Sequence, residues 1–213
     1  MSLRSGPPTD DAFIATTRRW VDRAVIGLNL CPFAKAVQAK GQVYYTVSRA
    51  NRPDQLMVDL VRELTALALA DPEDRDDTLL IHPDVLIDFP DFVAFLELAE
   101  AAIQDLGLEG VMQLATFHPG YQFEGTRPDD ISNYTNRSPY PTLHLLRESS
   151  VTRAVAAFPD AAAIFEKNIE TLRALGDEGW RRLDVGAPAA TTATVIRTAR
   201  PIPRTPRSGP RRR

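Results

Sequence analysis

Short apolar strands alternate with amphipathic helices along this chain of 213 residues. Apolar residues recur with a period near 3.6 at 10–27, 53–68, 91–106 and 159–175, which predicts four helices. Runs rich in β-branched, aromatic or continuous apolar residues predict strands at 42–48, 78–81, 111–117 and 142–146. This alternation predicts one α/β domain, with a small mixed or mostly parallel sheet covered by helices.

Charge and composition set the expected boundaries of that domain. Residues 185–213 contain seven arginines, five prolines and no acid, which gives +7, and the rest of the chain has 18 basic and 28 acidic residues, which gives −10. We expect a disordered N-terminus over 1–10, a single α/β domain over 11–183 and a disordered Arg/Pro-rich tail over 184–213. Two interpretations of the tail stay open: a solvated extension, or a weak electrostatic contact with RNA, anionic lipid or an acidic partner.

The composition also narrows the class of protein. An acidic body argues against DNA binding by the folded domain. The single cysteine, Cys31, cannot form an internal disulfide, and the polar N-terminus lacks the apolar core of a signal peptide. No apolar run is long enough to span a bilayer. We therefore expect a cytoplasmic protein without a membrane segment.

The segment Thr116–Glu148 is the expected functional surface. It contains a connection of about 24 residues between the last two strands, and loops of that length are functional or disordered. Five of the 16 aromatic residues and two of the three histidines lie in it, which favours an ordered loop. We therefore predict a long ordered loop that carries a site.

Cys31, His118 and His144 are the candidate chemical groups. His118 follows a buried strand, at the carboxyl end where open α/β sheets bind ligands. Each histidine has the alternative interpretation of a core imidazole bonded to the backbone, and Cys31 that of a small buried hydrophobe. If the three converge, they form either a divalent transition-metal site, such as zinc, or a thiolate nucleophile with a histidine base.

Two arginines form a second chemical theme. Arg137 lies in NRSPYP, where prolines stiffen the backbone and neutral donors surround the guanidinium. Arginine grips a carboxylate or phosphate at two points, so Arg137 is the expected anchor of a small anionic molecule. The alternatives are a clasp from Arg137 to Asp129 or Asp130, and a simple ion pair between Arg147 and Glu148.

Three motifs resemble a bacterial family catalogued only as a domain of unknown function, number fourteen-fifteen. They are NLCPFAK at 29–35, ATFHPGYQFEGT at 115–126 and NYTNRSPYPTLHLLRE at 133–148, and the likeness extends from about Phe13 to Leu175. The resemblance implies no known reaction. It implies that the following residues belong to the family pattern: Asn29, Cys31, Pro32, Phe33, His118, Tyr121, Phe123, Asn133, Asn136, Arg137, Ser138, Tyr140, His144 and Arg147.

These observations lead to an enzyme of unknown class as the first hypothesis, acting on a small anionic metabolite. The expected catalytic residues are Cys31, His118, His144 and Tyr140. The expected substrate contacts are Asn29, Tyr121, Asn133, Asn136, Arg137, Ser138 and Arg147. Two alternatives stay open: a non-catalytic module that binds a ligand or peptide, and a subunit of a larger assembly that uses its basic tail.

Overall fold

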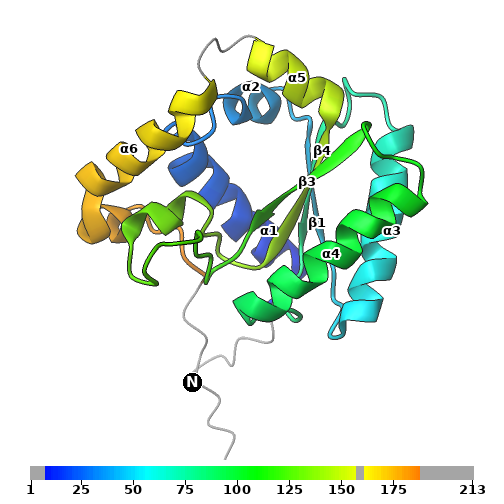
Figure 1. Ribbon diagram of the computed structural model, residues 1–213, viewed down its shortest axis with the longest axis horizontal. Helices are drawn as coiled ribbons and strands as arrows, with labels where there is room; N and C mark the ends of the chain where they lie inside the picture. Colours follow the sequence, from blue (N-terminus) through cyan, green and yellow to red (C-terminus); the bar gives the residue numbers. More distant parts are fainter. Residues whose placement is uncertain (1–7, 157–160, 188–213) are drawn as a thin grey trace, which may run out of the picture.

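The computed structural model describes residues 8–156 and 161–187 of the chain (Figure 1). The helices are α1 (Asp10–Trp20), the π-helix η1 (Val21–Ile26), α2 (Ala34–Ala39), α3 (Pro53–Leu69), α4 (Phe89–Asp105), the 3₁₀ helix η2 (Ile131–Thr135), α5 (Glu148–Ala156) and α6 (Ala161–Arg182). The strands are β1 (Val43–Val47), β2 (Asp77–Ile81), β3 (Met112–Phe117) and β4 (Thr142–Arg147).

The four strands form one open mixed sheet in the order β1-β2-β4-β3. β1 and β2 are parallel, whereas β4 is antiparallel to both of its neighbours, β2 and β3. The α/β prediction is confirmed, with one parallel pair in a mixed sheet. Because β4 lies between β2 and β3, the loop after β3 returns the chain to the middle of the sheet.

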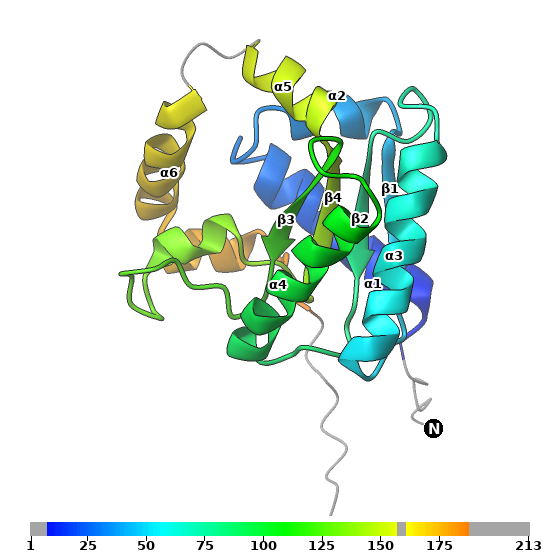
Figure 2. The ribbon, with the colours of Figure 1, turned by 45° about the vertical axis from the view of Figure 1, so that its right-hand side comes forward.

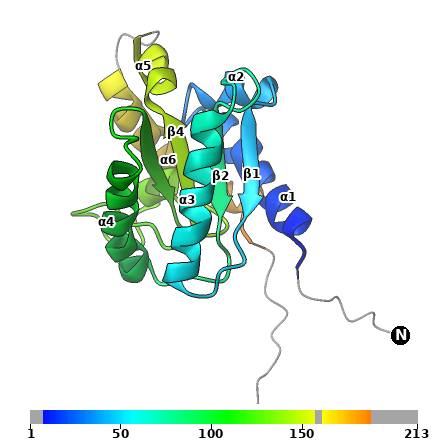
Figure 3. The ribbon, with the colours of Figure 1, turned by 90° about the vertical axis from the view of Figure 1, so that its right-hand side faces the viewer.

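Helices lie on both faces of the sheet (Figures 2 and 3). On one face α3 and α4 pack against the odd-numbered residues of β4, and Leu143 and Leu145 are fully buried there. On the other face α1 and η1 cover β1 and β2, with Trp20, Leu79 and Ile81 in a second apolar cluster. The alternation of side chains along each strand divides the core into these two clusters.

The apolar period of α3 explains its position. Pro53 occupies the first turn, where its missing N–H costs nothing. Leu56, Leu60, Leu64 and Leu67 follow at helical spacing and are all fully buried against the sheet. The predicted helix therefore forms as expected, and its buried stripe sets the α3 side of the core.

Two α-helices, the 3₁₀ helix η2 and a kink were not predicted. α2 begins directly after Phe33, beside Pro32, a residue type that usually interrupts a helix. α5 begins directly after β4 with no glycine or proline to mark the change. Gly176, the predicted end of the last helix, has φ 64, but helix resumes after it to Arg182. Glycine adopts this left-handed conformation without strain, so it bends the chain here rather than ending the helical segment.

The predicted tail begins too early in the sequence. Val185 is buried in the cluster around Trp20, and the Arg19 side chain donates to the Asp184 carbonyl at 2.8 Å. Residues 184 and 185 therefore belong to the packed domain, because an apolar side chain still finds core to cover. The rest of the predicted tail, 188–213, lies outside the described residues, as do residues 1–7. Among the helices described, none is both long and apolar enough to cross a membrane.

Leu143→Ala tests the importance of the central strand. Leu143 is fully buried where β4 meets the α3 and α4 layer, so the truncation leaves a cavity and is expected to lower the free energy of unfolding by about 3 kcal/mol. Urea unfolding followed by circular dichroism measures this. Leu98→Ala, on the exposed side of α4, is the matched control and is expected to change stability by less than about 0.5 kcal/mol.

Candidate functional site

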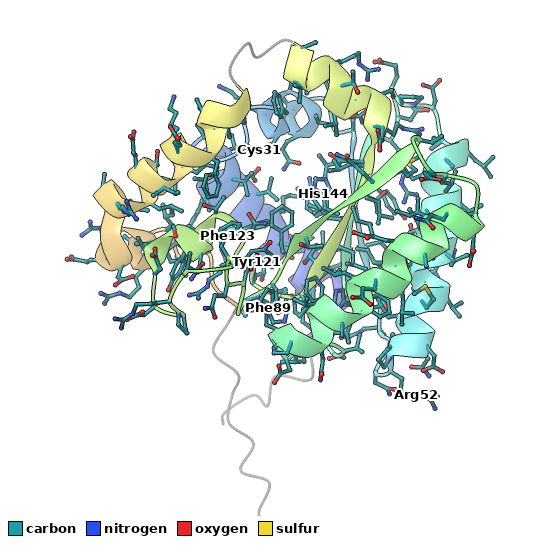
Figure 4. The ribbon with its side chains drawn as sticks, viewed as in Figure 1. Cys31, Arg52, Phe89, Tyr121, Phe123 and His144 are labelled. Atoms are coloured by element: carbon teal, nitrogen blue, oxygen red, sulfur yellow. The ribbon has the colours of Figure 1, made fainter. Side chains whose placement is uncertain are left out.

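A cavity of about 960 Å³ lies on the α1 side of the sheet, above β3 and β4. Its walls come from η1, from residues 31–34, from the first residues of β2 and from α5. Of the predicted site residues, Cys31 and His144 line it, and Figure 4 shows them on opposite sides of the space between α2, α5 and β4. The structure thus brings together one residue from upstream and one from the long motif.

His144 faces this cavity because the residues on either side of it, Leu143 and Leu145, face the α3 layer. Its Nε2 atom is buried, has no hydrogen bond among the described residues, and lies 3.4 Å from Oδ2 of Asp77, which is an electrostatic contact. Its Nδ1 atom has no hydrogen-bond partner among the described residues and is not among the buried unpartnered atoms. Since the imidazole lines the cavity, Nδ1 is the ring nitrogen that a ligand can reach.

Asp77 was missed as a site residue. The predicted strand began at residue 78, one position after Asp77, whereas the structure makes Asp77 the first residue of β2 and buries it. Asp77 pairs with Leu146 and Leu79 pairs with His144, so Asp77 and His144 are diagonal neighbours on one face of the sheet. Extending the predicted strand by one residue places Asp77 on the cavity face, two positions before Leu79, but only the β2–β4 pairing reveals its partner.

Cys31 follows η1 and is half-buried at the cavity wall. Burial raises the pKa of its thiol, backbone N–H groups of Phe33 and Ala34 counteract this in part, and the charge of Asp77 adds to the increase. In the described part of the chain no hydrogen bond joins this thiol to His144. Cys31 is therefore a neutral thiol at neutral pH, and it faces the imidazole across the cavity.

His118 lies elsewhere, as a structural histidine. Its Nδ1 accepts from the Gly120 backbone N–H at 2.9 Å, so Nε2 carries the proton and donates to the Leu86 carbonyl at 3.1 Å. Burial lowers the pKa of the imidazole, which favours this neutral form. The ring packs against Phe89 and Phe92 of α4, with centroids at 5.3 and 5.1 Å. Both of its nitrogens are therefore occupied: Nε2 holds the loop to the segment before α4, and Nδ1 closes the turn at Gly120.

Asn133 and Arg137 hold the long loop together from inside. Fully buried Asn133 accepts from the Phe123 backbone N–H and donates to the Arg127 carbonyl. Arg137 donates to the carbonyls of Tyr121, at 3.0 Å, and Pro128, at 2.6 Å. The clasp that closes the loop is therefore made with backbone carbonyls and not with Asp129 or Asp130, because the carbonyls lie within reach of the fork.

The remaining loop residues of the predicted site also have structural contacts. Asn136 donates to the Thr116 carbonyl, and Ser138 donates to the Tyr140 carbonyl. Tyr121 packs between Phe89 and Phe123, and Figure 4 shows these three rings together beside α4 and the loop.

Tyr140 and Asn29 lie outside this group of loop contacts. Tyr140 meets Phe13 of α1 edge-on at 4.9 Å, and burial raises the pKa of its phenol. Asn29 is exposed and has φ 54, a left-handed turn conformation that asparagine tolerates. Neither residue is among those that line the cavity.

Arg147 caps the end of α3. Its guanidinium donates to the carbonyls of Leu67, at 2.6 Å, and Ala70, at 2.7 Å. Carbonyls at a helix C-terminus have no partner within the helix, and the negative end of the helix dipole favours a cation. Arg147 is 8% exposed, so its positive charge is directed into the protein rather than to an anionic ligand.

The three predicted metal ligands do not come together. Cys31 and His144 share the cavity, whereas His118 is bonded to backbone near α4. Across residues 8–156 and 161–187, no group of three or more His, Cys, Asp or Glu side chains is placed to hold a metal ion. The donor geometry of the described residues thus gives no support to a zinc site.

Arg147→Met is expected to destabilise the fold by about 3 kcal/mol, because it leaves buried carbonyls at the end of α3 without donors. Chemical unfolding at neutral pH measures the loss. Arg127→Met removes an exposed ion pair with Asp129 and is the matched control, expected to cost less than about 1 kcal/mol. Equal costs for the two variants would contradict the capping role.

His82, immediately after β2, is the second buried histidine. It is fully buried, stacked on Phe92 and bonded through Nδ1 to the Val85 carbonyl at 3.0 Å. Burial lowers its pKa to about 4. Since an unfolded histidine has a pKa near 6.5, the unfolded chain binds a proton between pH 6.5 and 4 that the folded chain excludes. His82 therefore makes its whole contribution to the free energy of unfolding above pH 6.5, and this contribution is lost as the pH falls toward 4.

Because of His82, the free energy of unfolding is expected to be about 2 kcal/mol lower at pH 5 than at pH 7. The free energy of unfolding by urea, measured at both pH values, tests it. His82→Phe keeps an aromatic ring against Phe92 and removes the titration, so its stability is expected to vary less between the two pH values. An unchanged difference in the variant would show that other groups cause the acid sensitivity.

Comparison with known proteins gives one family. The profile of Protein of unknown function (DUF1415) matches residues 12–182. No curated protein and no solved structure matches the chain. The matched range runs from the first turns of α1 to the end of α6 and includes Cys31, Asp77 and His144. The chain therefore belongs to this family of proteins of unknown function.

Proposed function

We propose that this protein is an enzyme that acts on a small molecule in the cavity, with His144 as its proton-transferring group. The observation that carries the proposal is the buried contact of His144 Nε2 with Asp77, at 3.4 Å, together with an Nδ1 atom that faces the cavity. A carboxylate beside one ring nitrogen favours the tautomer whose proton is on that nitrogen. In the neutral ring Nε2 then carries the proton, and Nδ1 is left to accept one from a substrate.

The surroundings of His144 support this role. The Phe117 ring lies 5.9 Å from the imidazole, and both side chains line the cavity. Apolar walls exclude water and strengthen the interaction of His144 with Asp77, since electrostatic forces increase in a low dielectric. A fixed base in a cavity of about 960 Å³ is the arrangement that small-molecule enzymes use.

Cys31 supplies a second reactive group on the opposite wall. Its neutral thiol is a weak nucleophile until a base accepts its proton. A substrate that fills the space between Cys31 and His144 contacts both groups. The proposal therefore assigns proton transfer to His144 and gives Cys31 a supporting role, either as nucleophile or as acid.

The expected anion anchor is not part of this proposal. The guanidinium groups of Arg137 and Arg147 are bonded to backbone carbonyls. Moving either one to a ligand would leave carbonyls unpaired, which costs free energy.

A second candidate function is non-catalytic binding in the same cavity. It is favoured by the raised pKa of Cys31 and by the lack of a hydrogen bond from this thiol to His144 among the described residues. Both candidates share the cavity, and they differ in whether the bound molecule is transformed.

Incubation of the full-length protein with a mixture of small metabolites, followed by mass spectrometry, separates these candidates. The enzyme hypothesis expects specific compounds to be consumed, and His144→Gln to slow that consumption by about 10² to 10⁴, the usual contribution of a general acid or base. Undiminished turnover in His144→Gln would refute the role of His144. Binding without any turnover by the wild type would favour the second candidate.

Asp77→Asn and Asp76→Asn form the matched pair for the same assay. Asp77 contacts His144, whereas Asp76 accepts from Ser150 at 2.5 Å and lies 3.9 Å from Arg153. Loss of the Asp77 charge removes the partner of Nε2 and is expected to lower the rate at least about tenfold, and Asp76→Asn to change it little. Equal effects would mean that the charge of the cavity, rather than the contact with His144, matters.

A further inference from the structure

The floor of the cavity is an uncovered part of the sheet. On the α3 and α4 face of β4, Leu143 and Leu145 are fully buried. On the cavity face, Ala115, Phe117 and Leu146 are only half-buried, although they are apolar. The helical layer formed by α1 and η1 covers β1 and β2 and reaches β3 only where Trp20 meets one edge of Phe117, with ring centroids 5.0 Å apart, so it leaves Ala115 and Leu146 to the cavity. Apolar surface left open in this way favours an apolar occupant.

The charges of the cavity disfavour an anion at its floor. Its lining contains four acids, Asp71, Glu73, Asp76 and Asp77, but only two permanent cations, Lys40 and Arg153. Arg153 lies 3.9 Å from Asp76, which offsets its charge. Asp77 is 7% exposed and borders the floor beside His144, so a carboxylate brought to His144 would meet a like charge.

The hydrogen-bonding groups at the floor of the cavity favour a ligand that donates a hydrogen bond. Asp77 offers only acceptor oxygens, and its Oδ1 atom is buried without a partner among the described residues. If His144 keeps its proton on Nε2, the nitrogen 3.4 Å from Asp77, the Nδ1 atom is also an acceptor. A polar group that reaches the floor is best matched when it donates a proton.

Resting on the proposed function of His144, we infer the substrate class. The cavity takes an uncharged, mainly apolar molecule whose O–H, N–H or S–H group donates to Nδ1 of His144. Its apolar body lies over Ala115, Phe117 and Leu146, and its size is bounded by the volume of about 960 Å³. Anionic metabolites of similar size are excluded by Asp77.

Two fluorescent probes with the same aromatic body test this inference. N-phenyl-1-naphthylamine is neutral, and 8-anilino-1-naphthalenesulfonate adds one negative charge. The full-length protein is expected to bind the neutral probe saturably and the anionic probe at least about tenfold more weakly. Decanol is expected to displace the neutral probe more effectively than decanoate. Equal or tighter binding of the anions would overturn the inference.

The single thiol reports whether the probe occupies this cavity. Because Cys31 is the only cysteine of the chain, its alkylation by N-ethylmaleimide is unambiguous. Bound N-phenyl-1-naphthylamine is expected to slow the alkylation several-fold in the wild-type protein, with no substitution needed. Saturable probe binding that leaves the alkylation rate unchanged would place the probe elsewhere and overturn the assignment.

Ala115→Trp fills the floor and is expected to abolish probe binding. Leu98→Trp, on the exposed side of α4, is the matched control and is expected to preserve it. If Ala115→Trp unfolds, Ala115→Leu provides a smaller obstruction, expected to weaken binding at least about fivefold. Full binding by a folded Ala115 variant would overturn the inference.

The two proposals fail in different ways. His144→Gln is expected to retain probe binding within a few-fold while it loses turnover, because the apolar body of the ligand still fits. Turnover that depends on His144 together with no binding of neutral molecules would overturn the substrate class alone. Binding of the neutral probe with His144-independent turnover would overturn the proposed function alone.

Discussion

The register of β4 determines both the core and the cavity. This strand is hydrogen-bonded to β2 on one edge and to β3 on the other. Leu143, Leu145 and Arg147 face the α3 layer, so His144 and Leu146 must face the opposite side. A slip of one residue would put His144 into the apolar core and the two leucines into the cavity. The cost of that exchange holds the imidazole where a ligand can meet it.

The long loop before β4 contributes order rather than chemistry. Asn133 and Arg137 bond to backbone groups of the loop itself, and His118 fastens its start to the segment before α4. Buried backbone groups need such partners, because a loop has no ladder or helix to supply them. The many polar side chains that suggested anion recognition are explained by this need of the loop backbone for hydrogen-bond partners. These side chains hold the segment before β4 in one conformation.

The sequence predicted the parts of the fold that depend on local periodicity. The buried stripe of α3 and the apolar runs of β2, β3 and β4 are visible in the order of residues, and these elements form at the expected places. α2 and α5 escaped prediction because they are short and begin beside Pro32 and directly after β4, where the usual boundary signals mislead or are missing.

The candidate site was harder to foresee than the fold. Cys31 and His144 were recognised by their chemistry, and the structure places both at one cavity. Asp77 was not recognised, because its importance depends on the pairing of β2 with β4. These paired strands are far apart in the sequence, with 61 positions from Ile81 to Thr142. His118 and Arg137 were chosen for the same chemical reasons as His144. Only tertiary contacts separate a histidine or arginine that bonds to backbone from one that faces open space.

The polarity of the cavity affects both of its reactive groups, Cys31 and His144. The apolar walls that admit a ligand also raise the pKa of Cys31, so the thiol is neutral before a ligand arrives. A bound apolar molecule expels water, which lowers the local dielectric and strengthens the attraction between Asp77 and a protonated His144. In the proposed enzyme, chemistry therefore begins at His144 rather than at a preformed thiolate.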